Sequence, residues 1–303
     1  MLFCLLLTCY AGLRIDADSP CNLVQVRGVI QLGSQYFVLD KGEYQVKVTN
    51  DRGELLTHFG RQGEGPGEFQ YPSAIGAVAG EIWVHDQIQS HVQRFTTEGK
   101  YLGVHNISAI GPLQFEPEFL ILHTPTQASA FIVLDREFKE VGKVGEGMNA
   151  IGGIRVEEVV RFLQVFTTDA QGRHLYSLGV NGQTFSSYDL GTMTRQSARD
   201  LSLANYAAAQ KVEDTGGGIR TSGGRPVKSV VFHEGHLYTL VVDENQEAKA
   251  RMVILDPGGN IVGNSELGTY YTRIVANPGH GSAFFINEDE SLIEERPLRI
   301  DSK

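Results

Sequence analysis

Residues 59–102 read FGRQGEGPGEFQYPSAIGAVAGEIWVHDQIQSHVQRFTTEGKYL and contain one complete sheet-forming unit. A glycine- and proline-rich loop opens the unit, and short apolar runs then alternate with tight polar or glycine turns, the pattern of consecutive antiparallel strands. Four short strands in about 45 residues are typical of one β-propeller blade. Trp83, the only tryptophan, lies in a middle strand and is expected to be buried between blades. The expected strands are Ala74–Val78, Ile82–Val84, Val92–Thr96 and one that begins at Tyr101.

The order of these features resembles the NHL repeat. The residues that carry the likeness are FGRQGEGPGEF, the proline that follows, the strand IWVHD and the closing VQRFTTEGKYL. NHL repeats form six-bladed β-propellers, so the resemblance implies an all-β ring of four-stranded antiparallel blades. It does not imply an activity, because one fold supports many functions.

The same template can be laid along the chain from Asn22 to its end. It places the other blades at residues 36–59, 119–144, 162–189, 227–264 and 271–298. The last blade lacks an outer strand, whereas the alternating run Leu23–Arg27 precedes the first blade. Propellers protect their sheet edges by joining both chain ends in one blade. We therefore expect Leu23–Arg27 to pair with the last blade and close the ring.

Two insertions interrupt the spacing of the blades. Leu201–Val212 is alanine-rich with apolar residues at helical intervals, which predicts a short helix. Thr215–Gly224 predicts a surface loop, because it lacks the Gly-Lys-Ser/Thr ending and the strand-to-helix setting of a phosphate-binding loop. Gly145–Gly153 is interpreted in the same way.

Composition limits the class of protein and its partners. The 303 residues are 41% hydrophobic and 20% charged and include 35 glycines, which indicates a folded, turn-rich chain that we interpret as one domain. The formal net charge is −10, and no run of Lys and Arg occurs. This argues against nucleic-acid binding, which needs clustered cations.

The N-terminal residues indicate export. Met1–Leu13 is apolar but too short to span a bilayer, and a polar segment follows it. We expect a signal peptide over residues 1–21, a propeller over residues 22–303, and a periplasmic, cell-surface or extracellular location, with no transmembrane span after the signal. Leu6–Cys9 resembles a bacterial lipoprotein box, although Thr8 departs from the usual small residue before the cysteine, so a lipid anchor at Cys9 is an alternative. With three cysteines in all, no disulfide framework is expected.

Candidate ligand-binding residues lie on one face of the expected ring. Loops between blades share a face with the turns between middle strands, around the mouth of the central channel. Arginine there would suit an anionic group, because its planar fork can bind a carboxylate through two hydrogen bonds. The alternative is structural: Arg61 and Glu68 shape their loop, and Asp86 caps its own turn. The candidate rim residues are Arg61, Glu64, Glu68, Asp86, His91, Arg155, Arg220 and Arg225.

Catalytic and metal-binding motifs are not visible in the sequence. The nine histidines are scattered, and His233 and His236 lie on a hairpin turn, unlike the same-face pair of a helical His-Glu-x-x-His motif. Neither a Gly-x-Ser-x-Gly elbow nor a cysteine with a suitable base occurs. We expect no cofactor and no metal, and interpret the chain as a non-enzymatic binding or scaffold protein for a protein, peptide or glycan. The alternative is a lyase or hydrolase of the six-bladed type that uses Zn²⁺ or Ca²⁺.

Overall fold

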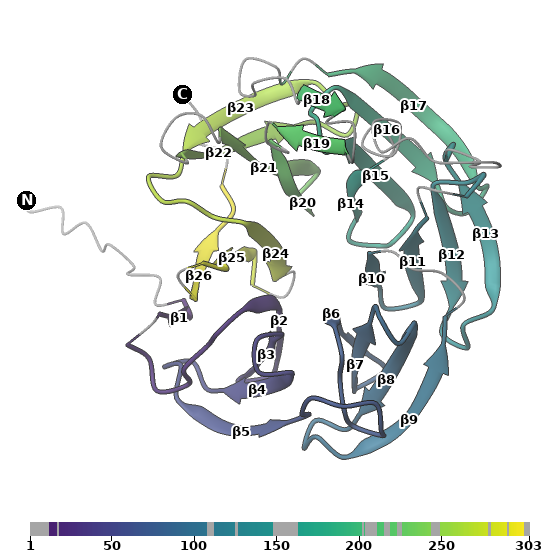
Figure 1. Ribbon diagram of the computed structural model, residues 1–303. Helices are drawn as coiled ribbons and strands as arrows, with labels where there is room; N and C mark the ends of the chain where they lie inside the picture. The colour runs from purple at the N-terminus through teal and green to yellow at the C-terminus, as the bar shows by residue number, and fades with distance from the viewer. Residues whose placement is uncertain are drawn as a thin grey trace, which may run out of the picture.

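The chain forms a ring of six sheets around a central axis (Figure 1). The computed structural model describes residues 12–16, 18–107, 112–124, 127–147, 163–201, 203, 211–214, 219–222, 226–243, 249–277, 280–289 and 291–299. Within these ranges the chain forms six four-stranded antiparallel sheets and one two-stranded hairpin, without an α-helix. The expected all-β, six-bladed propeller is therefore confirmed.

Each blade runs from an inner strand beside the axis to an outer strand at the rim, and the blades are named A to F in chain order. Blade A contains β2 (Val26–Leu32), β3 (Gln35–Asp40), β4 (Gln45–Thr49) and β5 (Leu55–Phe59). Blade B contains β6 (Pro72–Val78), β7 (Glu81–Asp86), β8 (His91–Phe95) and β9 (Tyr101–Asn106). Blade C contains β10 (Leu113–Phe115), β11 (Phe119–His123), β12 (Phe131–Asp135) and β13 (Glu140–Val144).

The second half of the ring repeats this order. Blade D contains β14 (Gln164–Thr168), β15 (His174–Gly179), β16 (Thr184–Asp189) and β17 (Thr194–Asp200). Blade E contains β20 (Val227–His233), β21 (His236–Asp243), β22 (Lys249–Leu255) and β23 (Ile261–Glu266). Blade F contains β24 (Arg273–Asn277), β25 (Ser282–Asn287) and β26 (Leu292–Pro297), and its fourth strand is β1 (Arg14–Ile15).

The second strand of a blade is buried on both faces. A strand covered on both sides has a nearly continuous apolar sequence, which explains why Phe37–Leu39 and Ile82–Val84 show no alternation. Trp83 is 4% exposed and stacks on Phe138 of the next blade, with ring centroids 5.3 Å apart, so its expected burial is confirmed. Outer strands face solvent, as the exposed Leu56 of β5 shows.

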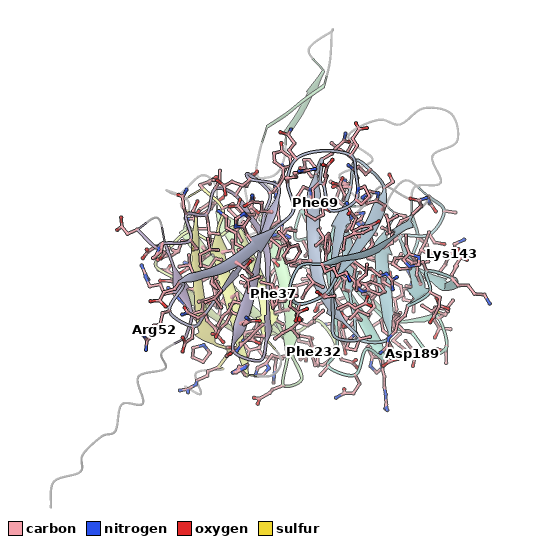
Figure 2. All side chains as sticks on the ribbon, turned by 90° about the horizontal axis from the view of Figure 1, so that it is seen from below. Phe37, Arg52, Phe69, Lys143, Asp189 and Phe232 are labelled. Carbon is pink, nitrogen blue, oxygen red and sulfur yellow. The ribbon has the colours of Figure 1, made fainter. Side chains whose placement is uncertain are left out.

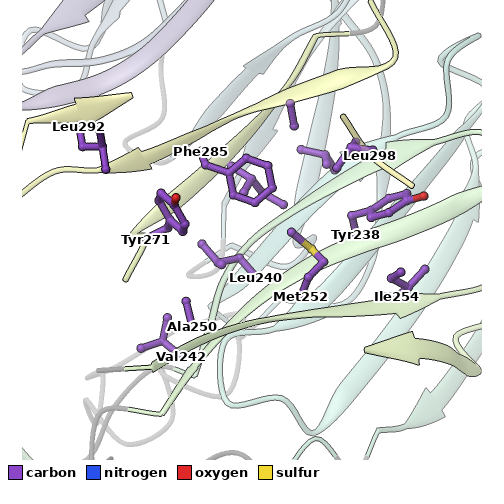
Figure 3. Packing of buried hydrophobic residues seen from close by; sticks show 13 residues of the cluster. Tyr238, Leu240, Val242, Ala250, Met252, Ile254, Tyr271, Phe285, Leu292 and Leu298 are labelled. Carbon is purple, nitrogen blue, oxygen red and sulfur yellow. The ribbon is translucent and has the colours of Figure 1, made fainter. Parts of the chain in front are cut away.

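The hydrophobic core is divided among the blade interfaces. Among the described residues, six clusters of buried side chains occur, one between each pair of neighbouring blades. Figure 3 shows the cluster between blades E and F, where Leu240 and Met252 of blade E lie beside Phe285 of blade F. Each blade must therefore have two neighbours to cover its apolar faces, and this requirement makes closure of the ring essential.

An N-terminal strand closes the ring, but it is not the expected one. β1 pairs antiparallel with β26, and Arg14 lies opposite Glu294. The expected closing strand, Leu23–Arg27, instead leads into β2, the inner strand of blade A. That prediction was wrong because β2 mixes apolar with polar residues and glycine. The sequence template therefore did not recognise β2 as the inner strand of blade A, and it left the beginning of β2 available for closing the ring.

A buried carboxylate holds the closing strand. Glu295 is 8% exposed and accepts hydrogen bonds from the Leu13 N–H at 3.2 Å and the Asn277 amide at 2.9 Å. Leu13 and Ile15 are fully buried in the cluster between blades F and A. Leu13, Arg14 and Ile15 thus contribute to the sheet and core of the propeller.

The expected insertions are only partly within the described ranges. Residues 202 and 204–210 of the expected helix lie outside them, and its last two residues belong to the strand β18 (Lys211–Asp214). This strand pairs with β19 (Ile219–Ser222), which occupies part of the expected loop Thr215–Gly224. Residues 148–153 of the other expected loop also lie outside. In the ranges given above, no helix has the length and apolar character required to cross a bilayer.

Candidate functional site

The two faces of the ring carry different connections. The connections between blades and the turns between second and third strands form one face, named the loop face. Phe69 lies on the loop face, and the β18–β19 hairpin extends from it, whereas Arg52 and Phe232 lie toward the opposite face (Figure 2). The candidate rim residues of blade B and its preceding loop are Arg61, Glu64, Glu68, Asp86 and His91, and all five belong to the loop face.

The loop between blades A and B is shaped by its glycines. Gly60 has a φ of 93°, and a Cβ there would lie 2.5 Å from the Phe69 ring. Gly63 has a φ of 155°, and a Cβ there would lie 2.1 Å from the Glu68 carboxylate. A side chain at either position would therefore displace the loop. These glycines explain the Gly/Pro signature in the sequence.

Charged residues of this loop bind one another. The Arg61 Nε donates to Glu68 Oε1 at 2.8 Å, and the Gly65 N–H donates to Glu68 Oε2 at 2.9 Å. The Gly65 hydrogen bond, followed by the bond from Arg61, lowers the pKa of the Glu68 carboxyl. Glu64 accepts a hydrogen bond from the Gln70 amide at 2.6 Å. The geometry thus favours a structural role for these three candidates.

Asp86 ends β7 and joins two segments of backbone. It is fully buried, and its carboxylate accepts hydrogen bonds from the backbone N–H groups of Gln70 at 2.6 Å, Tyr71 at 3.0 Å, Ile88 at 3.1 Å and Gln89 at 3.0 Å. Four donors saturate a carboxylate, so Asp86 fixes the interblade loop to the β7–β8 turn.

Blade A also has a buried aspartate that ends its second strand and accepts backbone hydrogen bonds. Asp40 ends β3, is fully buried, and accepts from the N–H groups of Val24 at 3.0 Å, Gln25 at 2.9 Å and Gly42 at 3.1 Å. The buried Lys47 adds an ion pair, with its Nζ 3.0 Å from Asp40 Oδ2. An acidic residue at the end of the second strand is therefore a structural part of the repeat in both blades.

His91 lies beside this network without joining a catalytic group. Its Nε2 is 3.2 Å from the Gln93 amide, which accepts from the Gly67 N–H at 2.8 Å and donates to the Glu68 carbonyl at 2.6 Å. Burial lowers the pKa of His91, so its ring is held neutral at physiological pH. Gln93 was not a candidate from the sequence, although it connects β8 to the interblade loop.

The remaining candidates are less fully described. Arg155 and Arg225 lie outside the described residues. Arg220 lies in β19, opposite Glu213 of β18, on the hairpin that extends from the loop face (Figure 2). Its backbone places it with the other loop-face candidates, and its side chain is outside the described part. A rim of cations around Arg61 therefore stays a prediction.

A different pair of arginines meets at the central channel. Arg27 of β2 and Arg273 of β24 lie on the inner strands of neighbouring blades, and both approach Glu288, which follows β25. Arg27 Nη1 is 3.0 Å from Glu288 Oε2, and Arg273 Nη2 is 3.5 Å from Glu288 Oε1. Burial lowers the pKa of Arg273, and the charge of Arg27 acts in the same direction.

The sequence analysis missed these three residues. Arg27 was placed in the wrong strand, and neither Arg273 nor Glu288 belongs to a motif. A usable signal was present, because each arginine is the single charge in an otherwise apolar or neutral strand, VRGVIQL or RIVAN. A charge in an inner strand is informative, since it has to face the channel or find a partner.

Ser73 and His85 form a second contact at the channel. The Ser73 Oγ lies 2.9 Å from His85 Nδ1 and 3.3 Å from the His85 carbonyl oxygen. His85 is fully buried, and burial lowers its pKa to about 4. A buried ring with so low a pKa is a weak base and does not contact solvent. We interpret the pair as a hydrogen-bonded contact that connects β6 to β7, and not as a serine nucleophile activated by a histidine.

Histidines and acids do not gather elsewhere in the part of the chain that the structure describes. His233 and His236 lie directly opposite each other across the β20–β21 hairpin. This register brings the two residues to one face of the hairpin, so the expectation that extended backbone separates them was wrong. Among the described residues, however, no group of three or more His, Cys, Asp or Glu side chains is placed to hold a metal ion.

Comparison with known proteins identifies the architecture. A family model, DUF5128, described as a 6-bladed beta-propeller, matches residues 13–123. The match spans the closing strand, blades A and B and the first half of blade C. No curated protein matches the chain in sequence.

Solved structures share the fold at low sequence identity. A Bacteroides fragilis protein inferred to be exported aligns over 95% of this chain and 94% of its own, with 14% identity and a TM-score of 0.59. A member of the duf4221 family from Bacteroides vulgatus aligns over 94% and 96%, with 9% identity and a TM-score of 0.57. Streptogramin B lyase aligns over 90% and 78%, with 13% identity and a TM-score of 0.54. At these identities the likeness concerns the fold and not the function.

Proposed function

We propose that this chain is an exported propeller that binds a protein, peptide or glycan partner on its loop face, without catalysis. The observation that carries the proposal is that the acids of this face hold the backbone in shape. Asp86 and Glu68 accept hydrogen bonds from backbone N–H groups of the loop, and these bonds occupy the oxygens that acid–base work would need. A surface fixed in this way loses little conformational entropy on binding, which favours recognition.

Export rests on the apolar N-terminus, and closure of the ring limits where an exported chain could be cleaved. Leu13 and Ile15 are buried in the interface between blades F and A, so a processed chain keeps a closed ring only if cleavage lies before Leu13. Cleavage at the boundary after Cys21 would remove β1. The alternative lipid anchor at Cys9 meets this condition, because it leaves β1 in the mature chain.

The alternative of a metal-assisted lyase or hydrolase has no observation in its favour within the described residues. The similarity to Streptogramin B lyase is a similarity of fold. The hydroxyl–imidazole contact between Ser73 and His85 uses a buried ring of low pKa. Binding without chemistry is thus the function that the geometry supports best.

Two exposed apolar residues provide a matched test. Ile88 lies in the β7–β8 turn of the loop face and is 62% exposed, whereas Leu56 lies on the outer strand β5 and is 50% exposed. Wild type, Ile88→Asp and Leu56→Asp would be compared on one array of peptides and glycans, after melting curves show that all three are folded. We expect the array signal to fall at least tenfold for Ile88→Asp and to stay unchanged for Leu56→Asp.

Other outcomes would count against the proposal. Absence of binding by the wild type, or loss of binding in Leu56→Asp alone, would exclude the loop face as a surface for these partners. Turnover of an array compound by the purified protein would show catalysis and favour the enzyme alternative.

A further inference from the structure

The contact between Arg27, Arg273 and Glu288 is unbalanced in charge. Two guanidinium groups share one carboxylate, which leaves one positive charge in excess. Arg61 pairs with Glu68 and Arg136 with Glu118 one to one, and where Arg14 and Arg296 share Glu294, Asp16 supplies a second carboxylate to Arg14. The excess occurs in a chain with a formal net charge of −10, so it is a local property of the channel.

Neither arginine uses its full hydrogen-bonding capacity. Each reaches Glu288 through a single terminal nitrogen, although a guanidinium offers a fork of two parallel donors. The Nε atoms of Arg27 and Arg273 are buried and have no hydrogen-bond acceptor within the described part of the chain. A buried donor without an acceptor is costly, so this arrangement is incomplete in energetic terms.

Solvent reaches the cluster, although it lies within the ring. The side chains of Arg27, Arg273 and Glu288 are 19%, 35% and 15% exposed. Arg27 is the bulged residue at the start of β2, and Lys228 is the bulged residue at the start of β20. A bulge redirects the strand and its side chain, so these two inner strands carry a cationic residue at the same position, the loop-face end of the strand.

We propose that Arg27 and Arg273 clamp a carboxylate group of a ligand that enters the channel from the loop face. This inference rests on the proposed binding function and names the chemical group of the ligand that the site recognises. The ligand carboxylate would supply acceptors to the two guanidinium groups and neutralise the positive charge that Glu288 leaves in excess.

A carboxylate fits this cluster better than a phosphate. Its single charge equals the excess of one, whereas a phosphate dianion would reverse the sign. A carboxylate is also planar, like the guanidinium fork. Glu288 shows that the two arginines already accept a carboxylate as their partner. Sugar acids and peptide C-termini both carry this group, and the choice between them is left to experiment.

Ligand titration of the full chain tests the chemistry. The probes are glucuronate and N-acetylglycine, with glucose and N-acetylglycinamide as their uncharged counterparts and inorganic phosphate as a competitor anion. We expect saturable binding of at least one carboxylate, measured by calorimetry, and at least tenfold weaker binding of its uncharged counterpart. Binding of glucuronate alone identifies a sugar acid, and binding of N-acetylglycine alone identifies a peptide end. Binding of neither carboxylate, or tighter binding of phosphate, would overturn the assignment.

Substitutions that are expected to change carboxylate affinity in opposite directions test the roles of the three residues. Arg27→Gln and Arg273→Gln should each weaken carboxylate binding at least tenfold, whereas Glu288→Gln should strengthen it, because the internal competitor is removed. Arg136→Gln is the matched control, since this arginine forms an exposed ion pair with Glu118. If either arginine variant fails to fold, the sign of the Glu288→Gln effect still decides the matter. An unchanged or weaker affinity in Glu288→Gln contradicts the clamp.

This test is separate from that of the proposed function. Loss of the clamp in a protein whose array binding still depends on Ile88 would end this inference and leave the binding role in place. If carboxylate binding is retained but no binding on the array depends on Ile88, the loop-face role ends and the carboxylate site remains.

Discussion

The junctions on either side of blade A are built in different ways. Between blades A and B the chain is continuous, and a loop is fixed by nearby groups, with Glu68 and Gly65 three residues apart. Between blades F and A the chain runs from β1 into β2, but β1 is held in blade F only by its pairing with β26, and Glu295 binds the backbone of Leu13 across 282 positions. The charged side chains of the A–B junction hold the loop in shape, whereas the F–A junction combines the buried Glu295 carboxylate with two arginines that share Glu288.

The largest expected effect concerns closure. A chain that begins at Asn22 lacks β1 and two fully buried side chains, Leu13 and Ile15, whereas a chain that begins at Gly12 keeps them. Removing a buried aliphatic side chain costs about 2 to 5 kcal/mol, so the shorter chain should lose about 4 to 10 kcal/mol of unfolding free energy. Chemical denaturation of both chains measures the difference. Equal unfolding curves would show that β1 does not close the ring.

The contrast between the junctions explains what the sequence could predict. The A–B loop has a local signature, since its glycines, Glu68 and Asp86 lie within 30 residues, and the blade and its turns were therefore placed correctly. Closure depends on a two-residue strand whose partner lies at the other end of the chain, and no local pattern marks it. The Arg27–Glu288–Arg273 cluster also joins distant segments, so it emerged only when the blades were placed in space.

The next largest effect tests the A–B junction at its buried acid. Asp86→Asn keeps the side-chain shape but turns one acceptor oxygen into an amide that faces backbone N–H donors. Two charge-assisted hydrogen bonds are lost, each worth about 1.5 to 3 kcal/mol, so about 3 to 6 kcal/mol of unfolding free energy should disappear. Asp135→Asn is the control, because this aspartate accepts two N–H groups in a more exposed turn. Equal losses in the two variants would mean that burial of Asp86 is unimportant.

A smaller effect depends on pH and involves His85. Burial lowers the pKa of this histidine to about 4, whereas the unfolded chain titrates near 6.5. Between these values the unfolded state binds a proton that the folded state does not, so stability is fully present above pH 6.5 and falls as the pH decreases to 4. The loss is about 3 kcal/mol by linkage. Denaturation from pH 7 to pH 4 should show this extra slope in the wild type, and the slope should be absent in His85→Gln. If the unfolding free energies of the wild type and His85→Gln depend on pH in the same way, His85 is not the source of the slope.

The smallest effect is expected for Arg61, and it separates the two uses of arginine most clearly. Its side chain is 77% exposed, and exposed ion pairs contribute little to stability, because solvent screens the charges and the long side chain loses conformational freedom. Glu68 would retain the Gly65 N–H in Arg61→Gln, and Asp86 and Gln93 would still hold the loop. The melting temperature should therefore stay within about 2 °C of the wild type. Carboxylate affinity should also be unchanged, in contrast to Arg273→Gln. A tenfold loss of carboxylate binding in Arg61→Gln would return the anion site to the A–B rim and remove the distinction between the junctions.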